Sequence, residues 1–82
     1  MTRFLVAAVH RIAGRPWALV TGNLAGDALR AGDEMELSDR TGTVHPVVIR
    51  SIEMHGPPGT TTLAVDAAFA DLLGAGSILR RG

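Results

Sequence analysis

Closely spaced turn residues divide this chain of 82 residues into short segments, and that spacing limits the fold more than any other feature. Residues 14–37 (GRPWALVTGNLAGDALRAGDEMEL) show the pattern: a turn, an apolar segment, a second turn region and an alternating segment. Glycine reaches positive φ angles without a Cβ clash, and proline fixes φ, so both suit chain reversals. The chain has no lysine, and no helical segment follows these glycines, so we interpret the stretch as a hairpin framework rather than a ligand cradle.

Six segments between the turns have the composition of β-strands: residues 3–12, 17–24, 34–37, 44–54, 60–65 and 77–80. The clearest alternation is in the third segment, where Met35 and Leu37 are predicted to face inward and the two glutamates outward. In the fourth, Pro46 predicts an edge position or a strand start, because proline cannot donate a ladder hydrogen bond.

The first segment, RFLVAAVHRI, allows two interpretations. Its two central alanines would permit a helix, and apolar side chains occupy both faces of a strand, so periodicity alone does not decide. The turn at residues 14–16 and the apolar segment after it favour the strand. That strand would place five side chains on one face: Phe4, Val6, Ala8, His10 and Ile12.

Only residues 66–73 have helical composition, with Asp66 as the predicted N-cap and Gly74 as the C′ residue. Closing the strands into a barrel would remove the exposed edges that invite aggregation. We therefore predict one domain, residues 1–82, with an all-β fold. Its expected form is a small closed Greek-key-type β-barrel of about six strands, with one short helical turn near residues 66–73.

Composition excludes several classes of function. The chain has no cysteine, which excludes disulfides and thiolate metal sites, and no lysine, which excludes a Walker A loop and a Schiff base. Its net charge of zero argues against a nonspecific nucleic-acid binder but leaves recognition of a nucleic-acid end open. The absence of cysteine makes a cytoplasmic location the default expectation. The apolar run at residues 4–9 is too short for a membrane span, so we expect no membrane partner. Arginine supplies every basic residue, which indicates GC-rich bacterial codon usage rather than an arginine-specific site.

Several motifs follow one another in a set order along nearly the whole chain: Gly14-Arg15, Val20-Thr21-Gly22, Leu29, Gly32-Asp33-Glu34, Leu37, Ile52-Glu53-Met54-His55, Gly76 and Ile78-Leu79. This order resembles the second, β-barrel domain of the translational GTPases of the elongation factor Tu group. The resemblance implies a β-barrel in which Gly22 and Gly32 lie where the backbone needs freedom. Without a GTPase domain we expect no GTP binding and no GTP hydrolysis.

In that family the barrel helps to hold the aminoacylated end of tRNA. The resemblance implies that Glu53 would lie against the terminal adenosine and His55 near the aminoacyl group, and alternation would put both on one face about 7 Å apart. Both residues are also interpretable as exposed strand-end residues, and for His55 this is the favoured interpretation. The family's arginine after the histidine is Gly56 here, the following loop is shortened, and the family's asparagine aligns most nearly with Thr60.

Trp17 and Arg15 complete the candidate binding residues, which are Glu53, His55, Gly56, Thr60, Trp17 and Arg15. Trp17 would either anchor a partner, stack on a base or plug one end of the barrel, and Arg15 lies at a hairpin tip where solvation is the simpler interpretation. The three histidines are too widely spaced for a zinc motif, and no serine lies in a nucleophile elbow, so we predict no metal, no cofactor and no catalytic residue. The expected function is a non-enzymatic binding or scaffold module that docks to a protein partner or to itself; the alternative is recognition of an RNA end.

Overall fold

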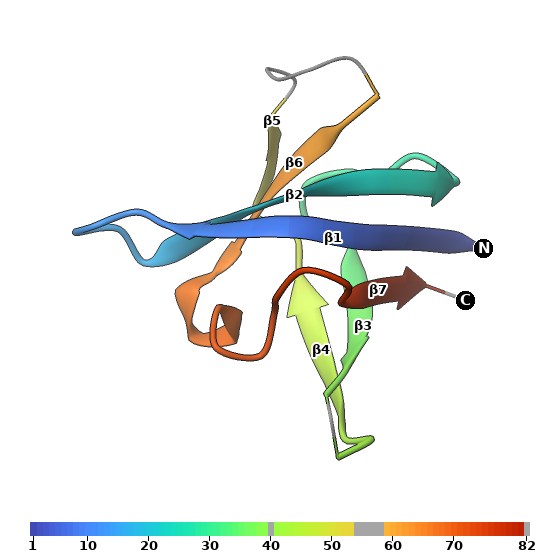
Figure 1. Cartoon of the computed structure of the whole chain (residues 1–82). Coiled ribbons are helices and arrows are strands. Elements are labelled where there is room, and N and C mark those ends of the chain that lie inside the picture. Colours follow the sequence, from blue (N-terminus) through green and yellow to red (C-terminus); the bar gives the residue numbers. More distant parts are fainter. Residues whose placement is uncertain (40, 54–58, 82) are drawn as a thin grey trace.

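The computed structural model describes residues 1–39, 41–53 and 59–81, and these form one curled antiparallel sheet that makes a half-barrel (Figure 1). Its strands are β1 (Thr2–Arg11), β2 (Trp17–Gly26), β3 (Glu34–Ser38), β4 (Val44–Val48), β5 (Ser51–Glu53), β6 (Thr61–Asp66) and β7 (Ile78–Arg81). A short 3₁₀ turn, η1 (Ala67–Phe69), follows β6. The strand order across the sheet is β4-β3-β7-β1-β2-β6-β5. The predicted all-β class is confirmed.

The described residues form seven strands where six were predicted, because the segment that begins at Val44 changes partners part-way along. Ile49 still bonds to the β3 side, donating its N–H to Asp33 O at 2.8 Å and accepting from Gly32 N at 2.7 Å. Arg50 then donates its N–H to Ala64 O at 2.8 Å, on the opposite end of the sheet. The two end strands of the sheet are therefore consecutive in the chain, joined by only two residues.

Pro46 lies in β4, which is an end strand of the sheet, so the predicted edge position is confirmed. Asp39 N donates to Thr43 O at 3.0 Å and Ile49 N to Asp33 O, so the odd-numbered residues of this segment bond to β3. Alternation then directs the backbone of Pro46 toward the free edge. Its missing N–H weakens that edge as a template for another strand.

The core fills the concave side of the sheet and consists mainly of branched aliphatic side chains. Met35 and Leu37 are fully buried between exposed glutamates, as the alternation predicted. The cluster comprises Phe4, Val6, Val20, Leu29, Met35, Leu37, Val47, Ile49, Leu63, Val65, Leu73 and Leu79. Within the described ranges, no helix is long and apolar enough to cross a membrane.

The predicted single face of β1 is correct only as far as Val6. A register shift between Val6 and Ala8 inserts one extra residue opposite β2. Because a bulge reverses the alternation beyond it, Val9 packs against the core, opposite buried Val20, and His10 is exposed. The prediction that Ala8 and His10 share one face with Phe4 and Val6 is therefore wrong.

The helical segment is shorter than residues 66–73. Asp66 caps it as predicted, since Asp66 Oδ1 accepts a hydrogen bond from Ala68 N at 3.0 Å. Gly74 does not end it with a positive φ, so its predicted C′ role is wrong; the positive φ of this loop, 92°, belongs to Gly76. Gly76 N donates to Val6 O at 2.9 Å, so the loop returns to β1 beside its bulge.

Candidate functional site

Trp17 lies at the turn end of the β1–β2 hairpin, on the convex face of the sheet. Its neighbour Ala18 is fully buried on the concave face, so alternation along β2 places the indole on the opposite side. The side chain is 36% exposed and belongs to no part of the core cluster. Trp17 therefore lies outside the core cluster, on the surface of the sheet, and it remains a candidate surface anchor.

Arg15 lies over the Trp17 ring, with its guanidinium carbon 5.8 Å from the ring centroid. The turn that brings them together is closed by Arg15 N donating to Ile12 O at 3.1 Å, and Gly14 supplies the positive φ of 76° that it needs. A cation–π contact at an exposed site is worth about 0.5–1 kcal/mol, so it is enough to favour one orientation of Arg15.

Beside this pair is a hollow of about 280 Å³ lined by Pro16, Trp17, Arg50 and Asp66. Register brings its walls together, because Trp17 is paired directly with Asp66 across β2 and β6. Pro16 O accepts a hydrogen bond from Ala67 N at 2.9 Å, which fixes the hairpin end to η1. Arg50 reaches the hollow from the short link between β4 and β5. We call these four residues together with Arg15 the hairpin-end site.

The charges of the hairpin-end site are not balanced by ion pairs. Among the residues that the structure describes, Arg11 pairs with Asp71 and Arg81 with Asp33, whereas neither Arg15 nor Arg50 has a carboxylate within ion-pair distance. The one acid of the site, Asp66, has an oxygen committed to the backbone of η1. An aromatic ring with two unpaired guanidiniums suits an anionic group more than a cation.

Glu53 lies on the same convex face, but not in the hairpin-end site. It is exposed in β5 and pairs with Thr62, whereas Trp17 pairs with Asp66, four residues further along β6. Along the strand direction alone, four residues separate them by about 13 Å. Beside Glu53, Thr62 and Thr21 share a hydrogen bond between hydroxyls at 3.1 Å.

The other predicted site residues are only partly placed. Thr60 is exposed and directly precedes β6, close in sequence to the partner of Glu53. His55 and Gly56 lie outside the described residues. The structure thus brings Trp17 and Arg15 together, and it sets Glu53 apart from them.

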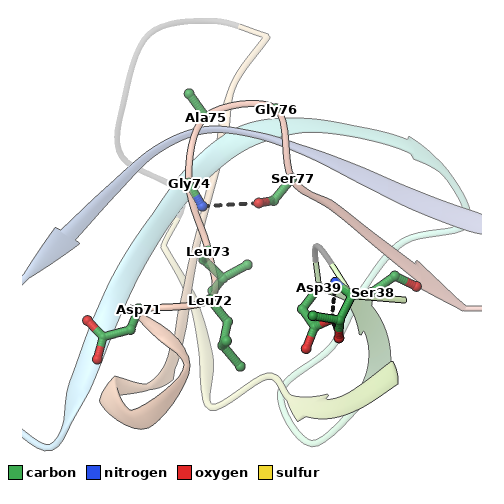
Figure 2. A pocket seen from close by; sticks show the side chains of 10 residues that line it. Ser38, Asp39, Asp71, Leu72, Leu73, Gly74, Ala75, Gly76 and Ser77 are labelled. Atoms are coloured by element: carbon green, nitrogen blue, oxygen red, sulfur yellow. Dashed lines mark hydrogen bonds between the residues drawn. The ribbon is translucent and has the colours of Figure 1, made fainter. Parts of the chain in front are cut away.

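A larger hollow, of about 670 Å³, lies between the β3–β4 turn and the loop at residues 71–77 (Figure 2). It is lined by Ser38, Asp39, Thr41, Asp71, Leu72, Leu73, Gly74, Ala75, Gly76 and Ser77. The two carboxylates lie on opposite walls, and both are engaged within the protein: Asp71 with Arg11, and Asp39 with its own turn. Ser77 Oγ accepts from Gly74 N at 3.1 Å, closing the loop above them. Both carboxylates of this hollow are therefore already engaged by other groups of the protein.

Asp39 organises the β3–β4 turn. Its Oδ1 accepts from Thr41 Oγ1 at 2.6 Å, from Thr41 N at 2.9 Å and from Thr43 N at 3.0 Å. Its Oδ2 lies 2.8 Å from His45 Nε2. The hydrogen bond from the Thr41 hydroxyl, followed by that from His45, holds the pKa of Asp39 well below its ordinary value of 3.8.

Acid is expected to loosen this turn. Because the folded-state pKa of Asp39 is depressed, its contribution to stability is present above about pH 4 and is lost as the pH falls below that value. We expect Asp39→Asn to lower stability at neutral pH and to flatten the fall in the free energy of unfolding between about pH 4 and pH 2. Denaturant unfolding across this range measures the slope, and equal slopes for the variant and the wild type would contradict the account. Some slope will remain, because hydrogen bonding by Arg30 N and Arg81 also lowers the pKa of Asp33.

No group of three or more metal-ligating side chains gathers among the described residues. A comparison with protein-family models and with curated proteins found no match to this sequence. Arg50 and Asp66 are the two charged members of the hairpin-end site that the sequence does not indicate as binding residues. The sequence indicates Asp66 only as a helix cap. It predicts a single strand over residues 44–54, so it does not indicate the link between β4 and β5 in which Arg50 lies. The signal that would have found them is the β2–β6 register, which local patterns do not determine.

Proposed function

We propose that this chain is a non-enzymatic binding module that docks to a protein partner through the hairpin-end site. The observation that carries the proposal is the exposed position of the only tryptophan, outside the core and beneath an arginine. Tryptophan and arginine are the residue types most enriched among the side chains that dominate protein–protein binding energies. A large ring held at a hairpin end by a backbone bond to η1 is also preorganised for binding.

The resemblance to the β-barrel domain of the elongation factor Tu group is part of this proposal, as are the closed Greek-key form and the cytoplasmic location. Closure is supported by the continuity of β4 and β5, whose two linking residues bond to opposite ends of the sheet. The loss of the family's arginine after His55 and the shortened loop there favour a protein partner over tRNA.

Recognition of an RNA end is the second candidate, favoured by the exposed position of Glu53 on the convex face. The pair of threonine hydroxyls beside it adds hydrogen-bonding groups. The net charge of zero weakens this candidate, because phosphate neutralisation supplies much of the affinity for nucleic acid. A chemical-shift titration with an RNA ending in CCA tests it: shifts at Glu53 and Thr62 would favour RNA.

Photocrosslinking tests the protein-docking proposal. A benzophenone amino acid replaces Trp17 in one variant and Arg3 in a control variant, and each is irradiated in a lysate of the source organism. Arg3 is exposed on the same sheet and pairs with Ala25, eight residues along β2 from Trp17, or about 26 Å. We expect one protein adduct at position 17 that is absent at position 3 and is suppressed by unlabelled wild-type protein. Equal adducts at both positions, or adducts only to RNA, would contradict the proposal.

A further inference from the structure

Two arginines without an ion-pair partner among the described residues belong to the hairpin-end site: Arg50 lines the hollow, and Arg15 lies over the Trp17 ring beside it. We infer that the hairpin-end site binds the carboxylates of an acidic protein segment, an inference that rests on the docking function proposed above. Arg15 approaches from the hairpin turn, over the ring, and Arg50 from the link between β4 and β5. The two arginines thus come from separate elements to the surroundings of Trp17.

The local charge excess stands out against a neutral chain. Eight arginines are balanced by eight acids over the whole sequence, yet the hairpin-end site holds two arginines and one acid. Arg11, at the end of β1, is already neutralised by Asp71. Asp66 faces the hollow but accepts a hydrogen bond from Ala68 N, so its charge is partly compensated by the start of η1. A carboxylate that approaches the site would therefore be attracted by the two guanidiniums more than it is repelled by Asp66.

Carboxylates fit the hollow better than a nucleotide does. Its volume of about 280 Å³ lies below the usual range for sites that enclose a drug-sized ligand, so it has room for a side chain or two. A guanidinium offers a planar fork of N–H donors that matches a carboxylate in a bidentate manner. Arg15 already covers one face of the Trp17 ring, which leaves less of the ring for a base to stack on. Nucleic acid would also need a wider basic surface than two arginines provide.

A substitution at Asp66 separates an electrostatic role of this residue from a purely structural one. Asparagine is as good an N-cap as aspartate, so Asp66→Asn keeps the cap and removes only the negative charge. Removing a like charge from the hollow should tighten the binding of an acidic ligand, whereas a site indifferent to charge would show no gain.

The experiment uses Trp17, the only tryptophan in the chain, as the fluorescent reporter. Capped hexaglutamate is titrated at low salt, with hexalysine and oligouridylate of equal length as comparison ligands. We expect saturable binding of hexaglutamate at millimolar concentration, weakened about threefold by Arg50→Ala or Arg15→Ala, since exposed ion pairs contribute up to about 1 kcal/mol. We expect Asp66→Asn to tighten it about twofold, and Arg3→Ala, at the opposite end of the β1–β2 hairpin, to leave it unchanged.

The inference is overturned if hexaglutamate fails to bind, if oligouridylate binds more tightly, or if Arg3→Ala weakens binding as much as Arg50→Ala does. These outcomes are separate from the docking proposal, because the photocrosslinked partner at position 17 is detected without any acidic peptide. If the partner that crosslinks at position 17 binds the Arg50→Ala variant with unchanged affinity, the docking proposal stands and the inference of an acidic segment is contradicted. A hollow that selects hexaglutamate by charge supports the inference even where no crosslink forms.

Discussion

Gly22→Ala is expected to lower the free energy of unfolding by about 3 kcal/mol or more, because the new methyl group would meet backbone rather than a movable side chain. A Cβ at this position would lie 2.0 Å from Leu5 O and 3.1 Å from the Phe4 ring. Gly22 is paired with Val6 in the central β1–β2 ladder, just before the bulge, so β1 cannot retreat without breaking that ladder. A domain of this size has a total stability of about 4–12 kcal/mol, so the variant should be unfolded or nearly so under mild denaturing conditions.

Gly74→Ala is the matched control. Gly74 has no positive φ, and a Cβ added there would have no neighbouring atom within 4 Å, so the same methyl group has room. We expect its free energy of unfolding to stay within about 0.5 kcal/mol of the wild-type value. Urea unfolding followed by circular dichroism measures both variants. If the two variants unfolded at the same urea concentration, the close approach of the β1 and β2 backbones at Gly22 would be contradicted as the cause of the destabilisation.

Phe4→Ala is expected to destabilise the protein by about 3–5 kcal/mol, the range for removing a buried aromatic ring and leaving a cavity. Phe4 is fully buried and lies opposite Leu24 on β2 and Leu79 on β7, at the middle of the sheet. The chain has only two phenylalanines and no tyrosine. The second, Phe69, is only partly buried against the core, so no other fully buried aromatic ring is available to fill the cavity.

Leu5→Ala removes a large apolar side chain from the next position of the same strand and serves as the control for Phe4→Ala. Leu5 is 43% exposed on the convex face, so we expect a loss of about 1 kcal/mol or less. Thermal unfolding of the two variants compares the two faces of β1 directly. If Leu5→Ala proved the more damaging substitution, the strand would have the opposite face inward, since a shift of one residue exchanges the two faces.

The strands and turns were predictable where local chemistry alone decides them. Met35 and Leu37 alternate with glutamates, and Pro46 belongs at an edge, because neither feature depends on a distant partner. The bulge after Val6 was not predictable, since both Ala7 and Ala8 are small enough to occupy either face. The division of residues 44–54 also depends on distant segments, because Ile49 and Arg50 bond to Asp33 and Ala64 respectively.

The candidate site divides in the same way. Trp17 and Arg15 could be found from the sequence, because a tryptophan beside a hairpin turn is conspicuous in a chain with so few aromatic residues. Arg50 and Asp66 join them only through the pairing of β2 with β6 and the return of the chain to Ala64. Glu53 is a candidate by resemblance, and it lies exposed on the convex face, away from the hairpin-end site.

The central claim, that Trp17 anchors a protein partner rather than the core, is tested most directly with the Trp17→Ala variant. The measurement is the affinity of the immobilised variant for the partner identified by crosslinking, after unfolding has shown that the variant is folded. We predict a change in stability of about 1 kcal/mol or less and a loss of affinity of about thirtyfold, which corresponds to a dominant interface residue. Undiminished affinity in the folded variant would contradict the claim, as would a loss of several kcal/mol of stability, which is what a buried tryptophan would show.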